Sequence, residues 1–201
     1  MIAAALLASL AVVGDVELPR LERGGASTPA ATVVGGGVAV LEVTVEGGRA
    51  VGTRRLSGGE AWLELLERDV SGWLFSPADA SGQVLAVGVY RPPQLSLDAE
   101  LSPGSPREAS ESLPFPERPV APAYPPGVVG DGAVIVEAIV GEDGSLSGER
   151  IVGSGSAFDS VALRASAGWR FRPARKEGRS VPARVCLVFG FRAPVVAPHP
   201  H

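Results

Sequence analysis

Gly72-Trp73-Leu74-Phe75-Ser76-Pro77-Ala78 and Gly168-Trp169-Arg170-Phe171-Arg172-Pro173-Ala174 are two versions of one heptapeptide in a chain of 201 residues. A glycine-led apolar run precedes each copy, at residues 37–45 and 132–140, and a glycine turn follows each run. Downstream, each copy leads to a glycine and a hydrophobic stretch that ends in an aromatic residue and an arginine. Self-similarity of this kind is the signature of repeated structural units. The sequence therefore predicts two small domains of the same fold.

The first repeat predicts a β-β-α-β order. Residues 39–45 alternate between apolar and polar side chains, as in a strand with one buried face. Gly47-Gly48 supplies the positive φ angles of a tight hairpin, and residues 49–56 form the returning strand. Apolar residues then recur at helical spacing over residues 62–73, and a third strand follows at residues 84–90.

The second repeat has the same order of signals. A strand is expected at residues 134–140, a returning strand at 146–152, a helix with its apolar stripe at 158–169, and a last strand at 185–191. A three-stranded sheet needs a helix against one face to be stable. The predicted fold class is α+β, with two tandem β-β-α-β domains, each a three-stranded antiparallel sheet with one packed helix.

The segments outside the repeats differ in composition. Residues 1–14 are apolar but shorter than the about 20 residues of a spanning helix, and they suit an export signal or weak anchor, a packed N-terminal helix, or a truncated start. Residues 92–121 are rich in proline and predict an exposed, semi-rigid linker. The predicted domains are therefore 15–91 and 122–192, with a tail at 193–201.

Composition argues against several classes of function. A net charge of -4 and a pI near 5.3 leave no basic footprint for nucleic acid. The single cysteine, Cys186, excludes an internal disulfide and a cysteine-based metal site, and we expect it to be buried. The histidines, His199 and His201, lie in the tail, where neither can serve as a base for a serine. We expect no catalytic residue, metal site or cofactor, and the chain is not predicted to be an enzyme.

Five side chains invite a functional interpretation that competes with a structural one. Trp73 and Trp169 are expected to plug the core between helix and sheet. Glu42 and Glu137 occupy equivalent places in the two repeats and are expected on a solvated sheet face. For Tyr124 two roles stay open, a structural staple onto the sheet and a contact with a partner.

The landmarks in residues 120–192 resemble the C-terminal domain of TonB, the periplasmic energy transducer of Gram-negative bacteria. They are Pro122-Ala123-Tyr124-Pro125, a glycine-led strand, an Asp-Gly turn, a Gly-Ser-Gly-Ser helix entry, Trp-x-Phe-x-Pro-Ala and a final strand ending in Phe. The Tyr-Pro element resembles the family's Gln-Pro-x-Tyr-Pro, with Ala121 in place of the glutamine. Residues 36–91 look like a diverged second copy without this element.

The resemblance implies a binding site. The family's domain takes up an extended peptide of an outer-membrane receptor, which adds as a strand beside the domain's final strand. Carried over, Pro122, Tyr124 and Pro125 lie near the docked peptide. The pairing strand then contributes one of two alternating sets of side chains, either Val185, Leu187 and Phe189 or Cys186, Val188 and Phe191. Residues 185–191 carry no charge, which suits a strand meant to be paired.

The resemblance also implies a role. It suggests a TonB-like protein of the periplasm or cell envelope, exported or weakly anchored in the inner membrane, that supports energy-dependent transport across the outer membrane. Its partners would be peptides of TonB-dependent receptors and, by extension, an inner-membrane motor complex. The whole proline-rich stretch, residues 92–126, is on the order of 110 Å long even if fully extended, and it lies between two domains. The alternative is a self-association module, in which the tandem domains pair with each other or with a second chain as a homodimer through edge strands.

Overall fold

The computed structural model describes residues 12–13, 16–28, 35–91, 98–106, 111–153 and 156–193. The predicted signal or anchor, residues 1–14, lies outside this part except for β1 (Val12–Val13), which pairs with β2 (Val16–Glu17). The two histidines of the tail also lie outside it. Among the helices described, none has both the length and the apolar character needed to cross a membrane.

Both repeats form the predicted β-β-α-β order. The first unit consists of β4 (Gly37–Glu46), β5 (Arg49–Gly58), α1 (Glu60–Val70) and β7 (Gly82–Tyr90). The second unit consists of β11 (Gly132–Val140), β12 (Leu146–Val152), α2 (Asp159–Ser166) and β16 (Ala183–Phe191). In each unit the three strands are antiparallel neighbours, in the order β5-β4-β7 and β12-β11-β16. The alternation and the glycine turns therefore predicted the local structure correctly.

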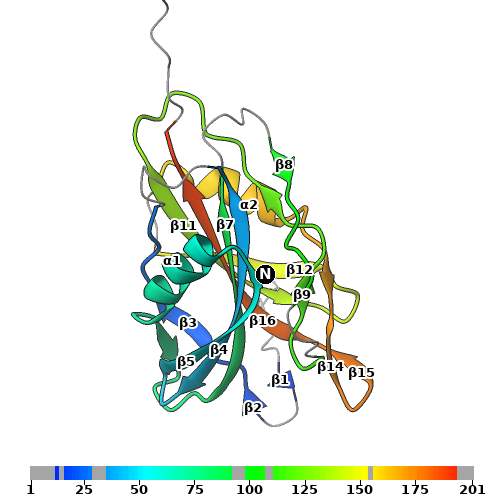
Figure 1. Cartoon of the computed structure of the whole chain (residues 1–201). Helices are drawn as coiled ribbons and strands as arrows, with labels where there is room; N and C mark the ends of the chain where they lie inside the picture. Colours follow the sequence, from blue (N-terminus) through cyan, green and yellow to red (C-terminus); the bar gives the residue numbers. More distant parts are fainter. Residues whose placement is uncertain are drawn as a thin grey trace, which may run out of the picture.

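The two units do not form two separate sheets, however. They share one eight-stranded sheet of order β12-β11-β16-β7-β4-β5-β6-β3, completed by β6 (Leu74–Ser76) and β3 (Arg20–Arg23) (Figure 1). The joint is the parallel pairing of β16 with β7, from Val185 opposite Leu85 to Gly190 opposite Tyr90. The expectation of two tandem three-stranded domains is corrected by this pairing, because each unit completes the sheet of the other.

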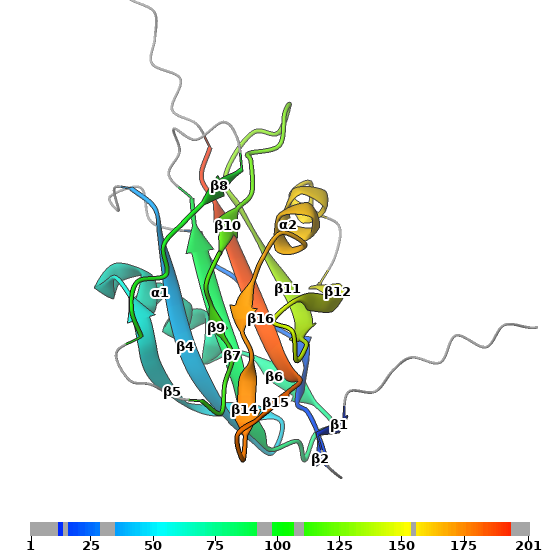
Figure 2. The ribbon, with the colours of Figure 1, turned by 90° about the vertical axis from the view of Figure 1, so that its right-hand side faces the viewer.

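The two helices lie on opposite faces of this sheet. Figure 2 shows α1 on one side of the strands and α2 on the other. Since β7 and β16 are equivalent, parallel and adjacent, the units are related by a half-turn about an axis along these strands, and that rotation exchanges the two faces. Successive side chains of a strand point to opposite faces, so β16 serves both layers. Leu187 lies in the core under α2, and Cys186 lies in the core under α1.

Each of the two cores contains side chains from both units. The core under α2 joins Trp169 and Phe158 of the second unit to Val40 and Val87 of the first. The core under α1 joins Trp62 and Trp73 to Ile135, Val152, Cys186 and Val188 of the second unit. The prediction that both heptapeptide tryptophans are core residues is confirmed, because Trp73 is 1% and Trp169 0% exposed. Neither unit can leave the other without exposing apolar surface to water.

The proline-rich segment is not simply an exposed linker. Its described part contributes Leu113, Phe115 and Ala121 to the core under α2. One short pairing fastens it to the second unit, β9 (Phe115–Pro116) with β13 (Phe171–Arg172), and another lies within it, β8 (Ala99–Glu100) with β10 (Val120–Ala121). Proline is tolerated in such edge positions, where its missing N–H breaks no ladder. The linker prediction was wrong here because the few apolar residues between the prolines decide where the segment lies. Residues 92–97 and 107–110 lie outside the described part.

In each unit a segment precedes the first strand of the β-β-α-β order, and we call this segment the lead-in of that unit. The lead-ins of the two units are equivalent. Leu18-Pro19-Arg20-Leu21-Glu22-Arg23 matches Leu113-Pro114-Phe115-Pro116-Glu117-Arg118. Strand β3 pairs with β6 after the first tryptophan, just as β9 pairs with β13 after the second. Each indole N–H then donates to a backbone carbonyl of its own lead-in, Trp73 to Gly25 at 3.0 Å and Trp169 to Val120 at 3.1 Å. The duplication therefore begins well before the first strand that the sequence analysis recognised.

Candidate interaction surface at the junction of the two units

The predicted pairing strand lies in the middle of the sheet. One edge of β16 pairs with β11 over the whole strand, and the other edge pairs with β7. The side chains proposed to face a peptide, 0–1% exposed, lie in the core under α2: Val185, Leu187, Phe189 and Phe191. Of the alternate set, Cys186 and Val188 lie in the core under α1, whereas Phe191 was wrongly assigned to it and shares the face of Val185, Leu187 and Phe189. The expected open edge at residues 185–191 is therefore corrected: the equivalent strand of the first unit occupies it.

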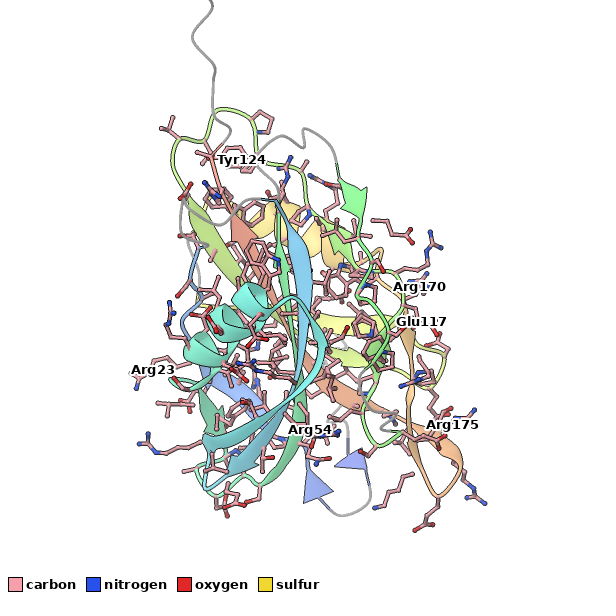
Figure 3. All side chains as sticks on the ribbon, viewed as in Figure 1. Arg23, Arg54, Glu117, Tyr124, Arg170 and Arg175 are labelled. Carbon is pink, nitrogen blue, oxygen red and sulfur yellow. The ribbon has the colours of Figure 1, made fainter. Side chains whose placement is uncertain are left out.

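The Tyr-Pro element lies beside the end of β16, where it packs on α2. Pro122 and Pro125 are buried, and Tyr124, which Figure 3 labels, is half-buried. The Tyr124 ring meets Phe158 edge-on with centroids 5.6 Å apart, and Phe158 contacts Phe191 at 4.5 Å. The Tyr124 hydroxyl donates to the carbonyl of Gly130. These contacts are those of a structural staple; contact of the same three residues with a partner stays a prediction.

A buried carboxylate ties the two units together. Glu137, on β11, is 2% exposed, and its Oε1 accepts a hydrogen bond of 2.6 Å from the backbone N–H of Leu21 in β3. Its Oε2 accepts from Arg150 Nη2 at 2.7 Å and lies 3.4 Å from Arg184 Nη1 and 3.8 Å from Arg20 Nε. A carboxylate can be buried only when its charge is paired and its lone pairs are satisfied, and here both conditions are met.

The same cluster fastens the lead-in of the first unit to the second. Arg150 Nη2 also donates to the carbonyl of Leu21 at 2.6 Å, so both backbone groups of Leu21 are bound by side chains of the second unit. The solvated face expected for Glu137 was wrong because residues 20–28 cross that face. We call residues 20–28 the strap.

The equivalent carboxylate of the first unit is also buried. Glu42 is 6% exposed, accepts from Arg54 and accepts from Gln83 Nε2 at 2.7 Å. Glu42 lies opposite Arg54 on the neighbouring strand, as Glu137 lies opposite Arg150. Cross-strand pairs of opposite charge stabilise a sheet. The solvated face expected for Glu42 is therefore also corrected, and the pair is a structural feature of both units.

Asp69 of α1 holds the far end of the strap. Its carboxylate is buried and accepts the Ser27 backbone N–H at 2.8 Å and the Ser27 hydroxyl at 2.5 Å. Burial raises the pKa of Asp69 above its ordinary value of 3.8, although the two Ser27 bonds act in the opposite direction. The strap is therefore bound at Leu21 to the second unit and at Ser27 to the first.

This shift predicts a pH-dependent difference between the protein and its Asp69→Asn variant. A folded-state pKa above the unfolded value stabilises the protein at low pH, and that contribution is lost as the pH rises through the folded pKa. As the pH rises from about 3 to about 7, we therefore expect the free energy of unfolding of Asp69→Asn to increase relative to that of the parent. Urea titrations at a series of pH values measure it. Asp143→Asn is the control, because Ser145 lowers the pKa of Asp143 and the trend should reverse. Parallel pH profiles of the two variants would contradict this account.

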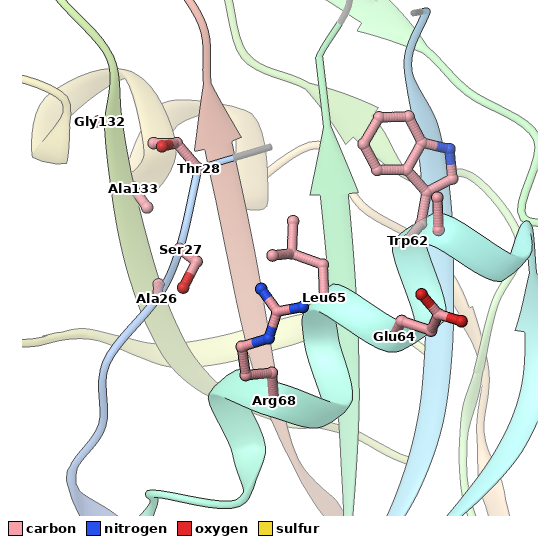
Figure 4. A pocket seen from close by; sticks show the side chains of 10 residues that line it. Ala26, Ser27, Thr28, Trp62, Glu64, Leu65, Arg68, Gly132 and Ala133 are labelled. Carbon is pink, nitrogen blue, oxygen red and sulfur yellow. The ribbon is translucent and has the colours of Figure 1, made fainter. Parts of the chain in front are cut away.

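An open groove lies between α1 and the strap, and we call it the α1 groove. Its volume is about 690 Å³. Figure 4 shows Leu65 and Arg68 on one side, Ser27 and Thr28 on the other, and Ala133 of the second unit beyond them. The rim carries both Glu64 and Arg68, so the groove offers apolar walls with charge of either sign at its mouth.

The second unit can be compared with known families now that its geometry is described. The family model of the Gram-negative bacterial TonB protein C-terminal matches residues 129–192. These residues belong to the TonB C-terminal domain family. The match runs from just before β11 to just after β16 and so contains the complete second unit. The search of curated proteins found no relative that matches the chain.

The match confirms the resemblance of the second unit to the C-terminal domain of the Gram-negative bacterial TonB protein. The family is associated with transport and is not an enzyme family. The match does not extend to the first unit, whose likeness to the TonB-type domain rests on the duplication of strands, helix and indole hydrogen bonds. Sequence reasoning missed the Glu137 cluster, although the Glu-Arg pairing in register was a usable signal.

Proposed function

We propose that this chain is a TonB-like protein of the cell envelope whose two units, the first being a diverged second copy, work as one paired module. The observation that carries the proposal is the parallel pairing of β7 with β16. This pairing corresponds to the self-association alternative, in which edge strands pair with each other. Here both strands, β7 and β16, belong to the same chain. Because both final strands are used within one molecule, the module needs no second copy, and we expect a monomer.

On this proposal, receptor peptides do not add beside residues 185–191. A guest strand would have to displace β7, which pairs with β16 at six positions and contributes Val87 and Val89 to the core under α2. Main-chain hydrogen bonds with a guest would replace those with β7, but the apolar surface of the first unit would be exposed to water. The balance favours the internal strand.

A second candidate keeps receptor peptides as partners and places them on β5. Among the described strands, the outer side of β5 pairs with β6 only at Arg49 opposite Leu74. Residues 50–55 along this side are exposed or half-buried, and Val51 has 57% of its surface exposed. An unpaired edge of this length can accept an extended peptide by strand addition. Transport across the outer membrane would then be supported through this edge.

Cys186 reports on whether the junction opens. The thiol is fully buried in the core under α1, and burial raises its pKa far above the ordinary value, which removes the reactive thiolate. We expect the native full-length chain to react with a water-soluble disulfide reagent at least about 100-fold more slowly than the unfolded chain. Adding an extended peptide from the N-terminal segment of an outer-membrane receptor should leave this rate unchanged.

The control places a thiol where it is exposed. Val51→Cys in a Cys186→Ala background should react at once, and peptide bound along β5 should slow its reaction. If the peptide instead accelerates labelling of Cys186 in the parent chain, β7 has been displaced and the paired-module proposal is overturned. Amide shifts confined to residues 50–55 would support the β5 candidate, and shifts at residues 185–190 would contradict it.

A further inference from the structure

The duplication allows each position of one lead-in to be compared with its counterpart. Residues 18–37 match residues 113–132 at a constant distance of 95, as between Leu18 and Leu113 and between Gly37 and Gly132. The match includes Val-Val-Gly at 33–35 and at 128–130. The two segments differ at more than half of these positions, and one difference concerns an aromatic residue: where the second unit has Tyr124, the first has Pro29.

In the second unit, Tyr124 fills a socket between lead-in and helix. Its ring packs edge-on against Phe158, its hydroxyl donates to the Gly130 carbonyl, and Phe158 in turn rests on Phe191. The aromatic ring of Tyr124 thereby closes the space between residues 121–123 and α2. Burial of the Tyr124 ring stabilises the fold, because the hydroxyl keeps a hydrogen-bond partner when the ring leaves water.

The walls of the same socket are kept in the first unit. Trp62 is the counterpart of Phe158, and Tyr90 is the counterpart of Phe191. The Trp62 ring stacks on the Tyr90 ring, with centroids 5.0 Å apart. Gly35 has a φ of +90°, close to the +95° of Gly130, so the two glycines share a positive φ. Position 68, like its counterpart 164, is arginine.

The first unit has no aromatic residue at the position of Tyr124, and the α1 groove lies against the described residues that precede this position. The groove is lined by Ala26, Ser27 and Thr28, the counterparts of residues 121–123, and by Trp62, Leu65 and Arg68 of α1. The chain contains no aromatic residue before Trp62, so its N-terminal part has no ring to place there. The second unit thus shows which kind of group fits against these walls, and none of the described residues of the first unit fills the α1 groove.

We propose that the α1 groove binds an aromatic side chain, followed by proline, from an extended segment of a partner protein. The ring takes the place that corresponds to Tyr124 in the second unit and packs against Trp62 and Leu65. The Arg68 guanidinium at the rim makes a cation–π contact with the face of the ring. A tyrosine would direct its hydroxyl to the Gly35 carbonyl. This inference goes beyond the paired module, which stands without it.

The probe is a peptide that copies the chain's own element. We use acetyl-Pro-Ala-Tyr-Pro-Pro-amide, the sequence of residues 122–126, with a Tyr→Ala peptide as control. Titrated into the full-length protein labelled with ¹⁵N, the tyrosine peptide should give saturable amide shifts at Ser27, Leu65 and Ala133. The alanine peptide should bind at least about tenfold more weakly, since it lacks the ring. Equal effects of the two peptides, or no shift at these residues, would overturn the proposal.

A grafted aromatic residue supplies the second measurement. Pro29→Tyr restores the residue of the second unit within the chain and should weaken binding of the tyrosine peptide at least about tenfold, because the site is then occupied internally. Pro29→Ala should leave that binding unchanged. If Pro29→Ala weakens binding as much as Pro29→Tyr does, the peptide does not compete for an aromatic socket and the proposal fails. Neither variant should alter labelling of Cys186, so failure here is distinct from failure of the paired module.

Discussion

Replacing Trp169 by alanine should lower the free energy of unfolding of the whole chain by about 3–5 kcal/mol, the range for truncating a large buried aromatic residue. The side chain is 0% exposed, contacts Phe171 and Phe189, and donates its indole N–H to the Val120 carbonyl. Truncation opens a cavity in the core under α2 and removes the anchor of the lead-in. Because that core contains strands of both units, the loss should appear in one transition followed by circular dichroism during denaturant unfolding.

The equivalent variant in the other core is the matched comparison. Trp73→Ala removes the same indole hydrogen bond and should cost a similar amount, whereas Val51→Ala, at an exposed position, should change stability by less than about 0.5 kcal/mol. Two separate transitions, of which Trp169→Ala lowers only one, would show that the units unfold independently. The single shared sheet would then be wrong.

The local structure of each unit was predictable because its signals are local. The glycine turns at 47–48 and 141–144, the alternation in β4 and β11, and the helical spacing after Gly59 each lie within one element. The joining of the units is different, since β7 and β16 are about 100 residues apart in the sequence. An uncharged strand at residues 185–191 is compatible with an open edge awaiting a peptide and equally with a central strand. Periodicity alone does not distinguish the two.

The carboxylates were misplaced for a related reason. Alternation along β4 and β11 assigns Glu42 and Glu137 to the face opposite the apolar residues, and in an isolated three-stranded sheet that face meets water. The half-turn between the units places the lead-in of one over the outer face of the other, while the two helices lie on opposite faces of the sheet (Figure 2), so both faces are covered. The repeated Leu-Pro-x-x-Glu-Arg at residues 18–23 and 113–118 was the available sign that each unit has a lead-in strand.

Replacing Glu137 by alanine should also cost about 3–5 kcal/mol, because breaking a buried ion pair leaves its partners uncompensated. Arg150 and Arg184 would lose the carboxylate, and the Leu21 N–H would lose its acceptor. The arginine side chains are 32% and 14% exposed, so water can relieve part of the penalty and the lower half of the range is expected. Denaturant unfolding gives the free energy, and hydrogen exchange of the Leu21 amide reports release of the strap.

Glu42→Ala separates this junction effect from the general cost of losing a buried carboxylate. Glu42 has the same cross-strand arginine, but Arg54 is 39% exposed and Gln83 is neutral, so about 1–3 kcal/mol is expected. In Glu42→Ala the Leu21 amide should stay protected, because its acceptor is intact. If the two variants cost the same and the Leu21 amide exchanges alike in both, Glu137 is an ordinary sheet residue. The strap would then be held by apolar packing of Leu21, by the Arg150 bond to the Leu21 carbonyl and by Asp69, without a contribution from the Glu137 carboxylate.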